Sequence, residues 1–359
     1  MSLFLAIAAV FFGRFIAARP VGYLRADSAV QVAAQASAQI TALDRHRLIE
    51  AMAVDVRQYY FDKKTAETTA SALLAHEQAG DYNALTDGQA FASVLARHLI
   101  EASGDLHFTM EYTPNKFPDF SKPPPPESQA RYRAAMEQAN CTFEKAAVGA
   151  NRIGLMKLNS FPDVAVCRSQ AESAMAALNR ADALIIDLRD NRGGYPNMVV
   201  FLASYLFDHP EYMFNPRDPV TEQSWTRSPV TGSRLVDKPV YILTSARTYS
   251  GAEQFSYDLK MLRRATLVGE PTGGANHTGV LHNLGDHFAI GIPEQRPVNP
   301  FSDKDWAVTG VEPDVKVGAA DALTTAERLA EARLRKRSDS ANQKNGPGSR
   351  HLYSTQKVS

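Results

Sequence analysis

The chain of 359 residues has only two cysteines, Cys141 and Cys167, and neither stands in a Cys-x-x-Cys pair. A disulfide-rich scaffold and a cysteine-based zinc site are therefore excluded. In an exported protein the two cysteines would form one bridge, because both flank the same predicted strand region. In a cytosolic protein they would be free thiols. The sequence leaves both alternatives open.

An excess of charge of either sign is also missing. Lys and Arg together number 39, as do Asp and Glu, so the formal net charge is zero. Without a basic excess we expect no nucleic-acid partner. The one strongly basic segment, 327–337, is interpreted as the polar face of a terminal helix.

A metalloprotease motif is missing as well. His277, His282 and His287 stand five residues apart in a glycine-rich stretch, and no pair of them has the i, i+4 spacing of a zinc-binding helix. We therefore expect neither a metal nor a cofactor.

The N-terminus lacks the Lys or Arg that normally precedes a signal sequence. Residues 1–27 nevertheless begin with an apolar run that breaks at Gly13-Arg14. This run suits the core of a signal peptide better than a membrane span, which needs roughly 20 apolar residues. We interpret the segment as a leader or an uncleaved anchor, which predicts a periplasmic or extracellular protein. The alternative is an ordinary helix that packs on the body of a cytoplasmic protein.

After the leader, residues 28–104 predict a small helical domain. Apolar residues recur at helical spacing over 45–60, 65–80 and 86–104. Residues 105–130 predict a strand and then a stiff linker, because a run of four prolines lacks backbone N–H donors.

Strand and helix patterns alternate from residue 131 to residue 335, which predicts an α/β domain with a largely parallel sheet. Residues 336–359 are polar and predict a disordered tail. Strands are expected at 152–161, 183–190, 238–245 and 265–270, and helices at 167–181, 197–207, 252–265 and 324–337.

The chemistry-bearing segments stand where predicted strands end. One of them, residues 246–255, reads ARTYSGAEQF and leads from an apolar strand directly into a helix. A serine in such a turn presents its hydroxyl outward, and the next N–H and the helix N-terminus stabilise negative charge. Ser250 is therefore a candidate nucleophile. The alternative is that it serves only as a helix N-cap.

Three further segments share this placement. DLRDNRGGYPN contains Gly193-Gly194, where glycine permits close backbone approach or makes a tight turn. VGEPTGGANHTG carries Glu270 and His277, and SGDLHFT carries Asp105 and His107. Histidine is the usual general base for a serine, because its pKa lies near neutrality.

These segments, in the order in which they occur along the chain, resemble the tail-specific (C-terminal processing) protease family. Within it they resemble the branch of interphotoreceptor retinoid-binding protein and tricorn protease. DLRDNRGG, GEPTGGA and TGVEPDVKV match three elements of the family, and the helical stretch ending in DLHF resembles the N-terminal domain of that branch. The likeness runs from about Leu48 to Val317. It implies a ClpP/crotonase-like α/β domain.

The resemblance also implies roles for particular residues. It places Ser250 as the nucleophile and the backbone N–H groups of Gly251 and of Gly193 or Gly194 in an oxyanion hole. The lysine of the Ser-Lys branch is missing after the GEPT element. His107 is therefore the expected base. The supporting residues that the resemblance implies are Glu270 and Glu312, between which the sequence does not choose.

The predicted function is that of a serine endopeptidase acting on peptide or protein substrates. Only about 40 residues separate Tyr112 from Arg152, fewer than a domain needs, so no inserted PDZ domain is expected. No stable membrane span is expected beyond the leader, and a homo-oligomer is left open. The alternatives are an apolar-ligand-binding module of the same fold without proteolysis, and an esterase-type serine hydrolase.

Overall fold

The computed structural model describes residues 40–213, 225–226, 229–295 and 306–345. The predicted leader and residues 346–359 of the predicted tail lie outside these residues. No helix in the described part of the chain is both long and apolar enough to cross a membrane.

Three helices form in the N-terminal region, and each begins at a side-chain cap. The side-chain oxygens of Thr41, Asp62 and Asp87 each accept a backbone N–H from the first turn of their helix, which satisfies one of its unpaired donors. The third helix ends at Gly104 with φ 70, a left-handed conformation that glycine adopts at little cost. The helices are α1 (Ala42–Tyr59), α2 (Lys63–Gln78) and α3 (Gly88–Ser103).

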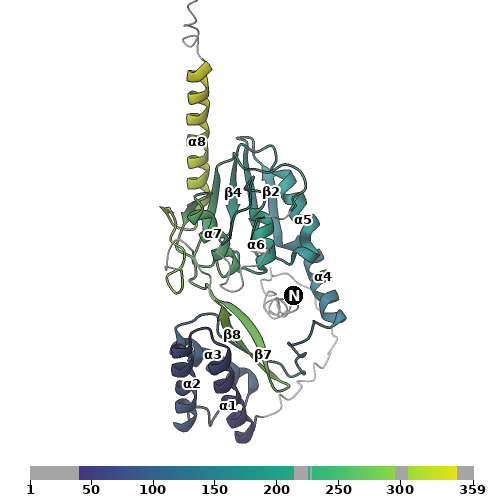
Figure 1. Cartoon of the computed structure of the whole chain (residues 1–359), viewed down its shortest axis with the longest axis vertical. Coiled ribbons are helices and arrows are strands. Elements are labelled where there is room, and N and C mark those ends of the chain that lie inside the picture. The colour runs from purple at the N-terminus through teal and green to yellow at the C-terminus, as the bar shows by residue number, and fades with distance from the viewer. Residues whose placement is uncertain (1–39, 214–224, 227–228, 296–305, 346–359) are drawn as a thin grey trace, which may run out of the picture.

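A small antiparallel sheet completes this unit, and two of its strands come from far along the chain. Strand β1 (Thr109–Tyr112) pairs with β8 (Phe288–Gln295), which pairs with β7 (Thr278–Leu284). Ile290 and Ile292 of β8 are fully buried in one core with side chains of α1, α2 and α3. The sequence prediction placed all of residues 131–335 in the α/β domain, but the structure pairs the β7–β8 hairpin with β1 and packs it on the helices (Figure 1).

The second unit is built on a six-stranded sheet in the order β2-β3-β4-β5-β6-β9. All neighbours run parallel except β2, which pairs antiparallel with β3 at the edge. The predicted α/β fold with a largely parallel sheet is confirmed. The strands are β2 (Phe143–Val148), β3 (Ile153–Leu158), β4 (Ala183–Asp187), β5 (Val240–Thr244), β6 (Thr266–Gly269) and β9 (Val315–Lys316).

The central strands β4 and β5 are apolar up to their last residues, Asp187 and Thr244, as expected for a sheet that is covered by helices on both faces. In β4, Leu184 and Ile186 face the larger core, whereas Ala183 and Ile185 face a smaller core that includes alanines of α8. Figure 1 shows α8 lying along one side of the sheet and then projecting beyond it. The helices are α4 (Pro126–Gln138), α5 (Val164–Ala177), α6 (Pro196–Ala203), α7 (Gly251–Met261) and α8 (Ala322–Asn345).

Two predicted boundaries differ from the structure. The Pro-rich linker ends earlier than expected, because Pro126 is the first residue of α4, where the missing N–H of a proline costs no hydrogen bond. Helix α8 continues to Asn345, so the first ten residues of the predicted disordered tail are helical.

Cys141 and Cys167 form a disulfide that ties the entry of β2 to α5. The residues Asn140 to Thr142 all have positive φ, which is costly for residues other than glycine. Cys167 is fully buried, so the bridge anchors this left-handed turn to the core of the α/β domain.

We expect reduction of this bridge, or a Cys141→Ser/Cys167→Ser double variant, to lower the free energy of unfolding by about 3 kcal/mol. The bridge closes a loop across a sequence separation of 26 residues, and cross-links of that size restrict the unfolded chain by this amount. Urea unfolding of the oxidised protein, the reduced protein and the variant measures the effect. Equal midpoints for all three would contradict it.

Candidate active site

Ser250 lies in the turn between β5 and α7 and is the N-cap residue of α7. Its backbone has φ 51 and ψ −120. A positive φ is costly for serine, whereas an ordinary N-cap residue has an extended backbone at no cost. Capping alone therefore does not account for this conformation. A strained strand-to-helix turn of this kind presents a side chain above the end of the sheet.

Glu253 holds this turn in place. Its side chain is fully buried and accepts the N–H of Ser250 at 2.8 Å, of Gly274 at 2.7 Å and of Ala275 at 2.9 Å. The Thr272 hydroxyl donates a fourth hydrogen bond at 2.5 Å. Burial raises the pKa of Glu253 to about 7, against the opposing effect of these donors. The carboxylate thereby joins the start of α7 to the loop that follows β6.

Glu253 was not among the predicted site residues. The signal was present, because Ser250 and Glu253 form the Ser-x-x-Glu pattern of a capping box. In that motif the glutamate accepts the N–H of the cap residue, as it does here.

We expect Glu253→Ala to lower the free energy of unfolding by about 3 kcal/mol or more, because it leaves four donors without their buried acceptor. Urea unfolding measures this loss. Glu312→Ala is the matched control, since the Glu312 side chain is 52% exposed and its removal is expected to change stability by less than about 0.5 kcal/mol. Equal effects of the two substitutions would argue against the role given to Glu253.

The glycine pair lies directly against the Ser250 turn. A Cβ on Gly193 would lie 2.7 Å from the Gly251 nitrogen, and a Cβ on Gly194 would lie 2.2 Å from the Phe161 carbonyl oxygen. Both glycines also have positive φ. No larger residue therefore fits at either position without moving the backbone.

Only one glycine of the pair has a free N–H. The Gly193 N–H donates to the Asn191 side-chain oxygen at 2.8 Å. In the described part of the chain, the N–H groups of Gly194 and Gly251 donate no hydrogen bond. They are neighbours, since a Cβ on Gly251 would lie 3.3 Å from the Gly194 nitrogen. This arrangement places two unpaired donors beside Ser250.

His107 belongs to a cluster with Asp105, which is buried, and His277; the two imidazole side chains are about one-tenth exposed. The Nδ1 atom of His107 accepts the backbone N–H of His277 at 3.1 Å and lies 3.6 Å from a carboxylate oxygen of Asp105. Its Nε2 is buried and has no hydrogen-bond partner among the described residues. Asp105 accepts the Tyr60 hydroxyl at 3.1 Å and pairs with His277 Nδ1 at 2.5 Å.

Burial and hydrogen bonding shift the pKa values of His107 and Asp105 in this cluster. Burial lowers the pKa of His107 below its ordinary value of 6.5, an effect that the nearby Asp105 carboxylate partly opposes. Burial alone would raise the pKa of Asp105, but hydrogen bonds with His107 and His277 hold that pKa well below its usual range. Asp105 therefore stays ionised, and His107 is neutral at pH 7.

Tyr249 places His107 beside the Ser250 turn. The rings of Tyr249 and His107 have centroids 5.8 Å apart, and the Tyr249 hydroxyl donates to the Leu106 carbonyl at 3.0 Å. Because His107 Nε2 has no partner, Ser250 and His107 are not hydrogen-bonded to each other. The structure brings the two residues to the same region, from opposite units of the fold.

The two glutamates expected to support His107 make their contacts elsewhere. Glu270 accepts the Ala319 N–H at 2.9 Å, and Glu312 pairs with Lys316 at 2.8 Å. The carboxylate beside His107 is Asp105 instead. The predicted segments contained both Asp105 and His277, but their pairing was missed because the two residues lie 172 positions apart in the sequence.

The histidines considered for a metal site do not gather. His282 pairs with Glu294 at 2.6 Å, and His287 Nδ1 lies 3.2 Å from the Thr113 carbonyl oxygen. The Asp105, His107 and His277 side chains offer ligand atoms within 4.8 Å of one another, a spacing that is compatible with a divalent cation. Their mutual hydrogen bonds account for the same placement without one.

Residues 152–317 match the family described as Peptidase family S41. A carboxyl-terminal-processing protease of Synechocystis sp. is 28% identical over 167 residues, which are 46% of this chain and 37% of that protein. The chain spans about a third to a half of the curated relatives that it matches.

Solved structures share the fold at low sequence identity. A lipoprotein from Streptococcus agalactiae has a TM-score of 0.54 at 13% identity, covering 80% of this chain and 96% of the other. The tricorn protease has a TM-score of 0.50 at 13% identity, covering 82% of this chain and 37% of the other. These likenesses concern the fold alone, and the narrower branch of retinoid-binding proteins stays a prediction. The resemblance to C-terminal processing proteases is confirmed, and residues 152–317 of this chain are a peptidase family S41 domain.

Proposed function

We propose that this protein is a serine peptidase with Ser250 as its nucleophile. The observation that carries the proposal is the strained Ser250 turn, held by the buried Glu253 and flanked by the two unpaired N–H groups of Gly194 and Gly251. A ligand-binding module needs neither the strained serine nor these donors. An esterase would use the same groups on a smaller acyl substrate, and the family favours a peptide bond.

In the proposed reaction, His107 accepts the proton of the Ser250 hydroxyl as Oγ attacks the substrate carbonyl carbon. A neutral imidazole whose Nδ1 accepts a hydrogen bond carries its proton on Nε2. For Nε2 to act as the base, Nδ1 must therefore give up the hydrogen bond that it accepts from the His277 N–H. It must instead donate one to the Asp105 carboxylate, which lies 3.6 Å away. With the proton on Nδ1, Nε2 is free to act as the base. Such contacts often tighten only when substrate binds.

The attack converts the carbonyl oxygen into an oxyanion, which the N–H groups of Gly194 and Gly251 stabilise. One such donor lowers the barrier by roughly 3 to 4 kcal/mol in a measured serine protease. The C–N bond then breaks, and the leaving amine takes the proton from His107. Water, deprotonated by the same histidine, hydrolyses the acyl-enzyme and restores Ser250. By analogy with the curated relatives, we place the cleaved bond near the C-terminus of a protein substrate.

A fluorophosphonate probe tests the proposal, because it reacts with activated serines. We expect the wild-type protein to be labelled on a single peptide that contains Ser250, as mapped by mass spectrometry after digestion. A folded wild-type protein that remains unlabelled would favour the apolar-ligand-binding alternative. Labelling at another serine would remove Ser250 from the mechanism.

We also propose that the protein is exported, which the Cys141–Cys167 bridge supports because such bonds persist in oxidising compartments. Cell fractionation followed by thiol alkylation tests this proposal. A cytoplasmic protein with two alkylated thiols would contradict it.

The rate of labelling is expected to fall at acid pH with a midpoint below 6.5. Only neutral His107 can accept the serine proton, and burial keeps the pKa of this ring below its ordinary value. The neutral form therefore persists to lower pH than for an exposed histidine, and activity is lost only as pH falls through the lowered pKa. Labelling rates between pH 4 and pH 8 measure the midpoint. A midpoint above pH 7 would contradict this environment for His107.

A further inference from the structure

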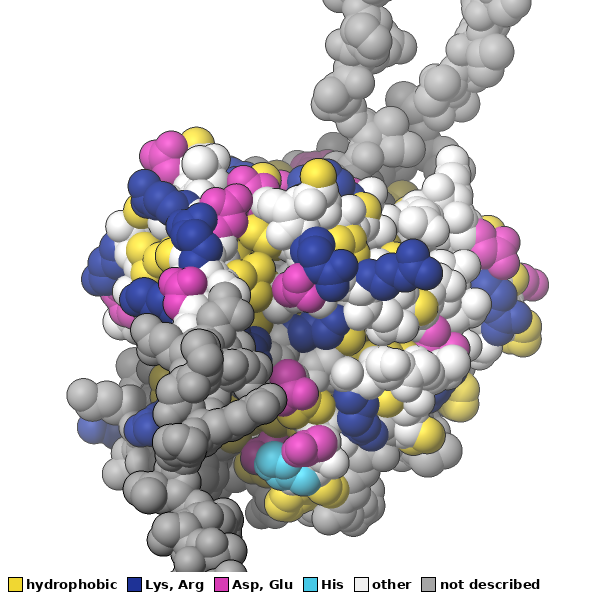
Figure 2. Space-filling model, turned by 90° about the horizontal axis from the view of Figure 1, so that it is seen from above, with side chains coloured by type: hydrophobic (Ala, Val, Ile, Leu, Met, Phe, Trp, Pro, Cys, Tyr) yellow, Lys and Arg dark blue, Asp and Glu magenta, His cyan; other side chains and the backbone are white. Residues whose placement is uncertain are grey.

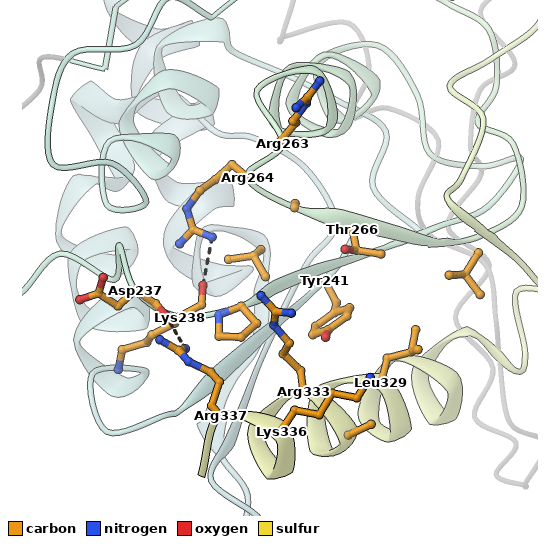
Figure 3. A pocket seen from close by; sticks show the side chains of 15 residues that line it. Asp237, Lys238, Tyr241, Arg263, Arg264, Thr266, Leu329, Arg333, Lys336 and Arg337 are labelled. Carbon is orange, nitrogen blue, oxygen red and sulfur yellow. Dashed lines mark hydrogen bonds between the residues drawn. The ribbon is translucent and has the colours of Figure 1, made fainter. Parts of the chain in front are cut away.

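We propose that a basic groove on the face remote from Ser250 binds a phosphate-bearing polyanion. The groove has a volume of about 680 Å³ and lies between α8 and the entry ends of β5 and β6 (Figure 3). This volume is in the range of small-molecule sites. Six cationic side chains line it, with Asp237 as the one lining carboxylate: Lys238, Arg263, Arg264, Arg333, Lys336 and Arg337.

The positive charge of the groove does not come from the polar face of one helix alone. Three of the cations come from α8, but Lys238 precedes β5, and Arg263 and Arg264 connect α7 to β6. Another carboxylate close by, Asp182, is paired with Arg152 at 2.8 Å and so does not neutralise the groove. A chain with no net charge therefore concentrates positive charge here, which attracts anions.

The innermost cations are bound to neutral groups. Arg264 donates to three backbone carbonyls, at distances between 2.7 and 3.0 Å. Lys238 Nζ donates to the Asn179 and Ala181 carbonyls at 2.6 and 2.5 Å. These bonds fix both side chains but leave their charges unbalanced. Burial lowers the pKa of each, so an anion in the groove would be stabilising.

Other side chains remain available to a ligand. In the described part of the chain, the side chains of Arg263, Arg333 and Lys336 make no hydrogen bond or ion pair. Figure 3 shows Arg333 rising from α8 toward Tyr241, a residue of the groove with a phenolic hydroxyl. Arginine forks bind phosphate oxygens in pairs, and a tyrosine hydroxyl adds a donor.

The groove lies at the opposite end of the sheet from the proposed active site, since Lys238 precedes β5 and Ser250 follows it. Figure 2 looks onto this end of the molecule and shows Lys and Arg side chains spread over the face. Apolar groups, including Pro239 and Leu329, also line the groove. A ligand that carries phosphate groups on a larger molecule fits this combination of cationic and apolar side chains. The phosphate would belong either to a phospholipid headgroup or to a soluble oligophosphate.

Isothermal titration of the full chain with tripolyphosphate tests the site. We expect the wild-type protein to bind, and the Arg263→Gln/Arg333→Gln variant to bind about 100-fold more weakly, at roughly tenfold for each charged hydrogen-bond donor lost. The matched control is Arg57→Gln/Arg97→Gln, two exposed arginines of the helical unit that pair with Glu67 and Glu101. Unchanged binding in the groove variant, or no binding by the wild-type protein to tripolyphosphate and vesicles alike, would overturn the proposal.

Vesicle co-sedimentation distinguishes the two sources. Binding to vesicles with 30% phosphatidic acid, but not to pure phosphatidylcholine, would identify a headgroup if the groove variant loses it. Binding of tripolyphosphate without vesicle binding would identify a soluble ligand. Fluorophosphonate labelling should be the same in the groove variant and in the wild type. The result for the groove is therefore independent of the result for the peptidase proposal.

Discussion

Ser250→Ala is expected to abolish fluorophosphonate labelling and to lower the rate of peptide hydrolysis by about 10⁶-fold. The substitution removes the only atom that forms the acyl bond in the proposed mechanism. His107→Ala is expected to cost nearly as much, because without a base the hydroxyl keeps its proton. The double variant should be no slower than either single variant, since the two residues act as one unit.

Ser256→Ala is the control for this experiment. Ser256 lies on the same helix, α7, but its hydroxyl is buried and donates to the Ala252 carbonyl at 2.7 Å. Its labelling should equal that of the wild-type protein. If His107→Ala is labelled at the wild-type rate while Ser250→Ala is not, the nucleophile stands and another residue must be the base.

Asp105→Asn is expected to slow labelling by about 10³- to 10⁴-fold, the size of effect seen when the aspartate of a serine-protease triad becomes asparagine. An asparagine side chain has no negative charge to stabilise a positively charged His107, and its NH2 group favours the tautomer whose proton is on Nε2. The substitution also replaces the partner of His277 Nδ1 and of the Tyr60 hydroxyl. Labelling rates and urea unfolding should therefore be measured on the same preparations.

The control for Asp105→Asn is Asp87→Asn. Asp87 caps α3 through the Ala90 N–H at 2.8 Å and lies in the same helical unit, outside the cluster. This control is expected to be labelled at the wild-type rate. A folded Asp105→Asn protein with undiminished labelling would show that His107 works without this carboxylate.

Local patterns predicted part of the backbone geometry around Ser250. The apolar strand before Ser250, the glycine after it and the Gly193-Gly194 pair predicted close approach at the strand ends, and the positive φ values of both glycines agree. Such patterns are informative because backbone conformation depends on neighbouring residues. The choice between Gly193 and Gly194 was out of reach, since it depends on the hydrogen bond from Gly193 to the Asn191 side chain.

The surroundings of His107 could not be predicted in the same way. Asp105 was expected only as a neighbour in sequence, and the glutamates named as support lie elsewhere. The pairing of Asp105 with His277 depends on the strands β7 and β8, which leave the α/β domain and join β1. A pattern of alternating apolar residues predicts a strand but does not name its partner, because pairing energies depend on the whole core.

The sequence by itself predicted most of the helices and strands, the largely parallel sheet and a strand-to-helix turn at Ser250, because each depends on periodicity, capping and turn chemistry within a few residues. The helix α4 and the strands β2 and β7 were not predicted, and the positive φ of Ser250 was found only in the structure. Only the tertiary structure decided which unit the β7–β8 hairpin joins and that Asp105 lies beside His107. It also decided that Glu253 holds the Ser250 turn and that six cations line one groove. These features arise from contacts between residues that are far apart in the chain. Such contacts form because the fold as a whole must bury its apolar side chains and give each buried polar group a hydrogen-bond partner.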